Sequence, residues 1–186
     1  MAGQSMTKWH FIFLTLMLVF SIISAGCLGD DASVPVPAAT NPQASFQPGQ
    51  VLQVFGDVTG EGIPHGTVDT ITFTVGLNPD IKSMDMEELV IVYADAIRTE
   101  TFTPVDGLRG DPPSGSWGIM SVKNEIGEPN NRISYEERFV IRVNPKAPIV
   151  PNQVITILLK SPTGKPTSIR RITPTTIQAE NLMSSI

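Results

Sequence analysis

Cys27 is the only cysteine in the chain, and its setting suggests a specific chemistry. It follows an uncharged, mostly apolar run, residues 11–26, which ends in Ser24, Ala25 and Gly26. A membrane-spanning helix needs about 20 apolar residues, whereas a shorter apolar segment ending in small residues is typical of a secretory signal. The residues before the cysteine also have the pattern of a lipobox, which directs a lipid onto the cysteine. We therefore expect residues 1–26 to be a signal peptide and Cys27 to carry a lipid, which anchors a protein firmly when it brings two acyl chains.

The groups that catalysis most often needs are missing from the rest of the sequence. After residue 26 there is one histidine, His65, in the loop-like stretch IPHGTVD. One histidine and no second cysteine leave no Ser-His-Asp or Cys-His arrangement and too few ligands for a typical zinc site. No glycine-rich phosphate loop follows a predicted strand. The sequence thus predicts a protein that is not an enzyme and has no catalytic residues, with His65 a loop histidine.

Carboxylates are the remaining candidates for binding a ligand. Asp57, Glu61 and Asp69 flank one predicted loop, and Asp106 and Asp111 flank another. Oxygen-rich loops suit calcium, but neither segment has the spacing of an EF-hand. We therefore expect no metal site and no cofactor, with calcium as the alternative to a solvated acidic surface.

The charge of the chain restricts its partners. The net charge is −5, and loss of Lys8 with the signal peptide makes it −6, which argues against nucleic acid as a partner. The charge is also unevenly distributed: residues 30–106 carry 12 acidic and 2 basic side chains, and residues 107–186 carry 6 acidic and 10 basic ones. Either the two halves pair within one domain, or an acidic face of one copy meets a basic face of another.

The segment after Cys27 differs in composition from everything beyond it. Residues 30–50 are rich in proline, alanine and serine, which indicates an extended tether. The chain from Cys27 onward is long enough for one domain with a hydrophobic core, and a single cysteine allows no intrachain disulfide. The sequence therefore predicts a signal peptide at 1–26, a tether at 27–50 and a folded domain at 51–186.

Apolar and polar residues alternate through the predicted domain. In Thr67–Leu77, Ile71, Phe73 and Val75 share one face and threonines occupy the other, the pattern of a strand with one buried face. Further strands are predicted at 51–60, 88–97, 99–104, 117–124, 138–144, 153–160 and 167–177, with proline and glycine clusters between most of them. Helix signals are limited to 83–89 and a short tail, 177–186. We predict an all-β fold, an antiparallel immunoglobulin-like β-sandwich of about 7–8 strands, preceded by the N-terminal hydrophobic segment.

Several motifs occur in an order that is more specific than any one of them. They are GDVTGEG, TVDTITFTVGLNPD, MDMEELVIVYAD, VKNEIGEPNNRISYEERFVIRV and IVPNQVITILLKSPTGKPTSIRRITPTTI. Together they resemble the outer domain of the archaellins, the archaeal flagellins, over about Val51 to Ile177. The resemblance implies a β-sandwich with a structural, non-enzymatic role at an archaeal cell surface.

The N-terminal segment departs from that family. Archaellins carry a short basic leader ending in glycine, followed by a long apolar helix that bundles into the filament core. Here no Lys-Gly or Arg-Gly precedes Phe11. The apolar run would give about 24 Å of helix at 1.5 Å per residue, and Pro35 and Pro37 prevent a helix shortly afterwards. The sequence therefore predicts an archaellin-like domain on a lipid tether.

Three functions remain open from the sequence. The first is a lipid-anchored surface protein on the extracellular face of the archaeal cytoplasmic membrane, associated with the archaellum, with envelope proteins or with further copies of itself. The second is a true archaellin subunit of the archaellum filament, with an atypical leader. The third is a tethered ligand-binding sandwich.

Overall fold

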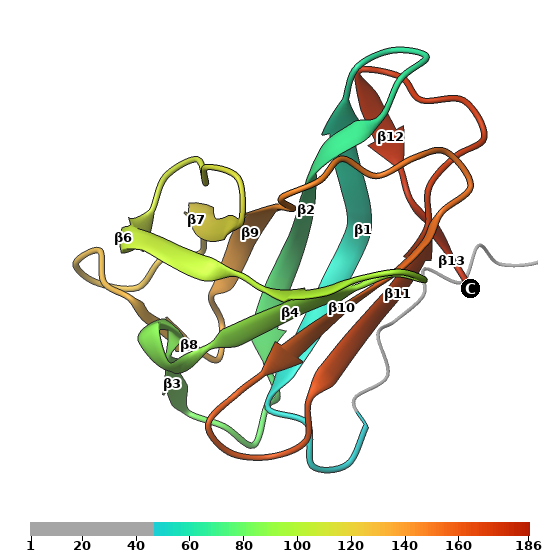
Figure 1. Cartoon of the computed structure of the whole chain (residues 1–186). Helices are drawn as coiled ribbons and strands as arrows, with labels where there is room; N and C mark the ends of the chain where they lie inside the picture. The colour runs from blue at the N-terminus through green and yellow to red at the C-terminus, as the bar shows by residue number, and fades with distance from the viewer. Residues whose placement is uncertain (1–46) are drawn as a thin grey trace, which may run out of the picture. The chain divides into compact units, whose positions relative to one another are not determined.

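The computed structural model describes residues 47–186. Two β-sheets pack face to face around a shared hydrophobic core (Figure 1). Within residues 47–186, no helix has the length and apolar character needed to cross a membrane. The predicted all-β sandwich is confirmed.

The first sheet has six strands in the order β12-β1-β2-β9-β7-β6. Their bounds are Glu180–Leu182, Leu52–Gly62, Val68–Leu77, Arg138–Asn144, Ser116–Lys123 and Thr103–Arg109, in that order. All neighbouring pairs are antiparallel except β6 and β7, which pair in parallel. Strand β1 contains a bulge, because Gly56 has φ 69° and the pairing register shifts between Phe55 and Thr59.

The second sheet has five antiparallel strands in the order β13-β11-β10-β4-β5. Their bounds are Ser184–Ser185, Thr167–Ile172, Val154–Lys160, Val90–Ala94 and Thr99–Thr101, in that order. A small two-stranded sheet pairs β3, Ser83–Asp85, with β8, Arg132–Ser134. The helical signal at 83–89 corresponds to one 3-10 turn, Met86–Glu88, where the Asp85 side chain accepts a hydrogen bond from the Glu87 N–H.

The core lies between the inner faces of the two larger sheets, and the predicted register of β2 is confirmed. Ile71, Phe73 and Val75 are fully buried, and the threonines between them lie on the outer face. Burying each such side chain stabilises the fold by about 1.5–3 kcal/mol. Opposite them, the inner residues of the second sheet include Ile91, Tyr93, Ile155, Ile157, Leu159 and Ile169.

The predicted helical tail at 177–186 is wrong, because this segment forms two short strands. Strand β12 pairs with β1 in the first sheet, and β13 pairs with β11 in the second. The buried Asn181 side chain donates hydrogen bonds to the carbonyls of Gly60 and Gln178. The last residues therefore join the edges of both sheets, and these tertiary bonds outweigh the weak local helix preference.

Candidate functional site

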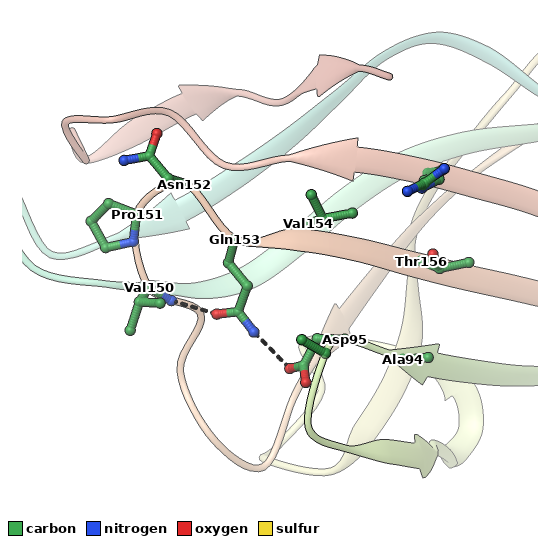
Figure 2. A pocket seen from close by; sticks show the side chains of 10 residues that line it. Ala94, Asp95, Val150, Pro151, Asn152, Gln153, Val154 and Thr156 are labelled. Carbon is green, nitrogen blue, oxygen red and sulfur yellow. Dashed lines mark hydrogen bonds between the residues drawn. The ribbon is translucent and has the colours of Figure 1, made fainter.

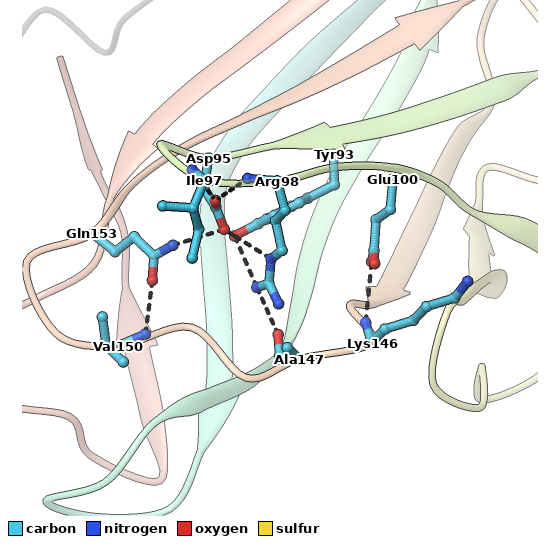
Figure 3. A network of polar contacts seen from close by, with 9 residues as sticks. All are labelled: Tyr93, Asp95, Ile97, Arg98, Glu100, Lys146, Ala147, Val150 and Gln153. Carbon is cyan, nitrogen blue, oxygen red and sulfur yellow. Dashed lines mark hydrogen bonds and ion pairs between the residues drawn. The ribbon is translucent and has the colours of Figure 1, made fainter.

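A buried carboxylate organises the turn between β4 and β5 (Figure 3). The Asp95 side chain is 0% exposed and forms an ion pair of 2.8 Å with the Arg98 guanidinium. It also accepts hydrogen bonds from the backbone N–H groups of Ile97 and Arg98, both at 3.0 Å, which is the bonding of an Asx turn. The Tyr93 hydroxyl and the Gln153 side-chain amide donate to the same carboxylate at 2.9 and 2.7 Å. Asp95 therefore joins β4, the turn after it and the loop that precedes β10.

The protonation of this network follows from its contacts. Burial alone would raise the pKa of Asp95, but hydrogen bonds from Ile97, Tyr93 and Arg98 and the charge of Arg98 hold it below its ordinary value. Burial raises the pKa of Tyr93 to about 12, and the neighbouring Asp95 adds to this rise. Near neutral pH the carboxylate is charged and the phenol is protonated, so neither is poised to exchange protons as a general acid or base.

The network extends to the loop that follows β9. The Arg98 guanidinium donates to the carbonyl of Ala147 at 2.7 Å and lies 5.1 Å from the centre of the Tyr93 ring. Gln153 connects the turn at Asp95 with this loop, because its amide oxygen also accepts a hydrogen bond from the Val150 N–H at 3.0 Å. These contacts fix the shape of the loop 145–153 against the second sheet.

Beside this network, the outer surface of the second sheet is hollowed (Figure 2). The hollow has a volume of about 650 Å³. Its floor includes Ala94 and Thr156, which are cross-strand partners, and Arg170 is the partner of Thr156 on the other side. Val150 and Pro151 also line it. The small side chains of the floor create the depression, and Arg170 gives it a positive charge.

The outer face of the first sheet contains a three-way contact of charged groups instead. Arg142 on β9 forms ion pairs with Glu61 and with Asp111, the latter at 3.0 Å, and donates to the Thr72 hydroxyl at 3.2 Å. The Arg142 side chain is 18% exposed, whereas the carboxylates are 51% and 68% exposed. One cation thus contacts two carboxylates, one from the end of β1 and one from the loop after β6, and the three groups together carry a net charge of −1.

These contacts account for several of the calcium candidates. Glu61 and Asp111 contact Arg142, and Asp69 accepts a hydrogen bond from the Thr67 hydroxyl at 3.4 Å. Asp57 and Asp106 are exposed. Over residues 47–186, no three His, Cys, Asp or Glu side chains are grouped closely enough to hold a metal ion. The two acidic loops are therefore not brought together as one set of ligands.

The remaining candidate residues lie in simple environments or outside the described range. His65 is exposed in the loop between β1 and β2, with φ 60°, and its N–H donates to the carbonyl of Ile177. Cys27 and the lipobox residues Ser24, Ala25 and Gly26 lie outside the described residues.

Sequence reasoning missed the Asp95 network. The contacts of Asp95 within its own turn could have been predicted from the stretch YADAIRT, where an aspartate directly follows an apolar strand and an arginine comes three residues later. Gln153 is 58 residues away from Asp95 and had no such signal.

The fold can now be compared with known structures. The archaeal flagellin FlaB1 from Methanocaldococcus jannaschii matches 73% of this chain and 98% of its own, with a TM-score of 0.54 and 16% sequence identity. The archaeal flagellum of Methanospirillum hungatei strain JF1 matches over 72% of this chain and 71% of that chain, with a TM-score of 0.51 and 13% identity. No protein-family model and no curated protein matches the chain in sequence. At these identities the comparison establishes the fold, and the described domain is archaellin-like.

Proposed function

We propose that this protein is a structural, non-enzymatic component of an archaeal cell surface, held on the membrane by a lipid at Cys27 and associated with the archaellum or the cell envelope. The observation that supports it most is the archaellin-like fold, which extends over nearly the whole of the FlaB1 chain. The domain would then act as a packing unit that contacts neighbouring proteins.

The chemistry of the described residues is consistent with a structural role. The polar groups around Asp95 are satisfied by one another and hold the turn after β4 and the loop before β10 in place. The charged groups around Arg142 form ion pairs with one another. The functional groups of both clusters are engaged in holding segments of the chain together, which leaves little for catalysis.

The lipid anchor is the finer part of the proposal and rests on the N-terminal sequence. Cys27 directly follows a short apolar run ending in Ser-Ala-Gly, and a proline-rich segment separates it from the domain. This arrangement would place the folded domain outside the membrane, on a tether formed by residues 27–50.

Two alternative functions would use different parts of the chain. A true archaellin subunit of the filament would keep the apolar run, residues 11–26, as part of its mature chain. A tethered ligand-binding sandwich would use the hollow beside Arg170 for a small ligand. The first alternative is favoured by the fold, whereas the second has only this shallow depression in its support.

Mass spectrometry of the N-terminal peptide tests the proposal directly, with material from native membranes and from sheared surface filaments. We expect a lipid-modified Cys27 as the first residue, in the membrane fraction. A Cys27→Ser variant is the matched control and should lose the modification and leave the membrane. If an N-terminus that retains residues 11–26 is found in the filament fraction, the lipid anchor is wrong and the protein is an archaellin.

A further inference from the structure

The outer face of the second sheet is apolar at its centre and exposed. Val90, Val92 and Ala94 of β4 point outward between the buried Ile91 and Tyr93. Val154 and Leu158 of β10 point the same way, since Leu158 is the cross-strand partner of Val92. Ile97 and Val150, beside the hollow, are 89% and 51% exposed. Val92, Ala94 and Leu158 are partly exposed, so that the apolar side chains of this face are accessible to a partner.

The charged side chains on this face are all positive. The hairpin formed by β10 and β11, residues 154–172, contains four basic residues and no aspartate or glutamate. Two of them lie on the outer face: Lys160 is opposite Val90, and Arg170 is opposite Thr156. Neither side chain has an ion pair or hydrogen bond with any residue in the described part of the chain. We call Val90, Val92, Ala94, Val154, Leu158, Lys160 and Arg170 the cationic face.

One edge of the first sheet, formed by β1 and β12, combines negative charge with exposed apolar side chains. Glu61 on β1 and Glu180 on β12 are direct cross-strand partners, an arrangement that destabilises a strand pair unless a cation is near. Glu61 contacts Arg142, whereas Glu180 has no side-chain partner within residues 47–186. Leu182 and Ile63 are 60% and 62% exposed. We call Glu61, Ile63, Glu180 and Leu182 the acidic edge.

These two surfaces match each other in charge and in apolar character. The alternation of buried and exposed residues places them on the outward sides of different sheets, where each is available to another copy. A contact between them joins different patches of two copies, and such a contact continues from copy to copy unless it closes into a ring. We propose that the cationic face of one copy of this chain binds the acidic edge of a second copy, head to tail. The inference rests on the proposed structural role at the cell surface, and does not depend on the lipid at Cys27.

Complementary charge reversal tests this contact. The full chain in detergent is studied by sedimentation velocity, which measures how many copies associate. We expect the wild type to associate at about 0.1 M salt and to separate as the salt approaches 1 M, because the screening length falls from about 10 Å to about 3 Å. Arg170→Glu and Glu180→Lys should each weaken association at least about tenfold, since each sets like charges against each other.

Mixing the two variants gives the decisive result. In an equimolar mixture, the new glutamate on the cationic face of one variant meets the new lysine on the acidic edge of the other. The unchanged pair, Arg170 with Glu180, then forms the next contact. Association should therefore return in the mixture, and also in the double variant, although each single variant fails alone. Every protein retains residues 1–46, so that differences between variants report on the domain.

Two variants serve as matched controls. Lys123→Glu at the end of β7 and Glu128→Lys in the loop after it change exposed charges away from both surfaces, by the same amount. They should associate like the wild type. Far-ultraviolet circular dichroism verifies that all variants retain their β-sheet content.

Several results would overturn the proposal. One is a mixture that associates no better than the single variants, and another is an equal weakening by the control variants, which would mean a general effect of charge. If the wild-type protein is monomeric at low salt but binds vesicles of anionic lipid, the cationic face binds a membrane surface instead. If Cys27 is lipid-modified but the chain never self-associates, this inference fails while the proposed function stands.

Discussion

The two outer faces of this sandwich use their charged side chains differently. On the first sheet, Arg142 lies between two carboxylates and a hydroxyl, and the Arg138 guanidinium lies 4.0 Å from the centre of the Phe55 ring. On the second sheet, Lys160 and Arg170 lie beside exposed valines, and neither forms an ion pair with any residue in 47–186. On the first face the arginines have partners within the same chain, whereas on the second face the two basic side chains have none among the described residues.

This difference shows which charges belong to the fold and which are available to a partner. Both sheets have the same alternation of inward apolar residues, so that alternation alone cannot distinguish their outer faces. The distinction comes from particular residues, because Glu61 at the end of β1 and Asp111 in the loop after β6 supply carboxylates to the first face. The hairpin of β10 and β11 supplies only cations to the second.

The largest effect should come from a charge placed inside the sandwich. Phe73 is fully buried on the inner face of β2. Phe73→Asp loses a large apolar contact and buries an unpaired carboxylate, each costing about 3–5 kcal/mol, so that the domain should not fold cooperatively. Thr72→Asp, on the outer face beside Arg142, should change the free energy of unfolding by less than about 1 kcal/mol. Thermal denaturation followed by circular dichroism checks both; equal effects would mean that the faces of β2 are wrongly assigned.

The next largest effect is expected at the buried carboxylate. Asp95→Asn places an amide N–H₂ among the donors of Tyr93, Arg98 and Gln153 and removes the counter-charge of Arg98. Breaking such a buried pair costs about 3–5 kcal/mol, measured as a lower free energy of unfolding in urea. Asp80→Asn is the matched control, because Asp80 is exposed, and should stay within about 0.5 kcal/mol. A loss at Asp95 no larger than at Asp80 would contradict the structural role of the network.

The same network predicts how stability depends on pH. The pKa of Asp95 is lower in the fold than in the unfolded chain, so that its contribution is present above about pH 4 and is lost as the pH falls. The pKa of Tyr93 is raised to about 12, so that its contribution is complete below about pH 10 and is lost between pH 10 and 12. Asp95→Asn should flatten the acid limb of the unfolding free energy, and Tyr93→Phe the alkaline limb. Unchanged limbs in both variants would contradict these assignments.

What the sequence could predict follows from how local each signal is. The inward register of β2 was predictable because apolar and polar residues alternate along consecutive positions of the strand. The strands β12 and β13 were missed because distant partners on β1, such as Gly60 and Val58, hold Asn181 and Met183 in place. The pairing of Arg142 with Glu61 joins residues 81 positions apart, and charge counts alone left open whether it lay within one copy. That Lys160 and Arg170 meet acidic residues of a second copy remains a prediction for the same reason.

A smaller effect is expected at the outer face of the first sheet. Arg142→Met removes two ion pairs and one hydrogen bond but keeps the aliphatic part of the side chain. Because both carboxylates are largely exposed and return to water, the free energy of unfolding should fall by about 1 kcal/mol. Urea denaturation at low and high salt measures this, and the loss should be smaller at high salt. A cost above about 3 kcal/mol would mean that the ion pairs are shielded from solvent.

The smallest effect is expected at the outer face of the second sheet. Arg170→Ser removes a side chain with no partner in residues 47–186, so that the free energy of unfolding of the single copy should stay within about 0.5 kcal/mol of the wild type. The matched comparison is Arg142→Met, which removes one arginine from the outer face of the first sheet. A measurement under conditions where the chain does not self-associate isolates the single copy, and urea denaturation suffices. If Arg170→Ser destabilises as much as Arg142→Met, Arg170 has a partner inside the domain, and the contrast between the two faces disappears. If it leaves stability unchanged, Arg170 has no role in the fold of the single copy, as the proposed contact with a second copy requires.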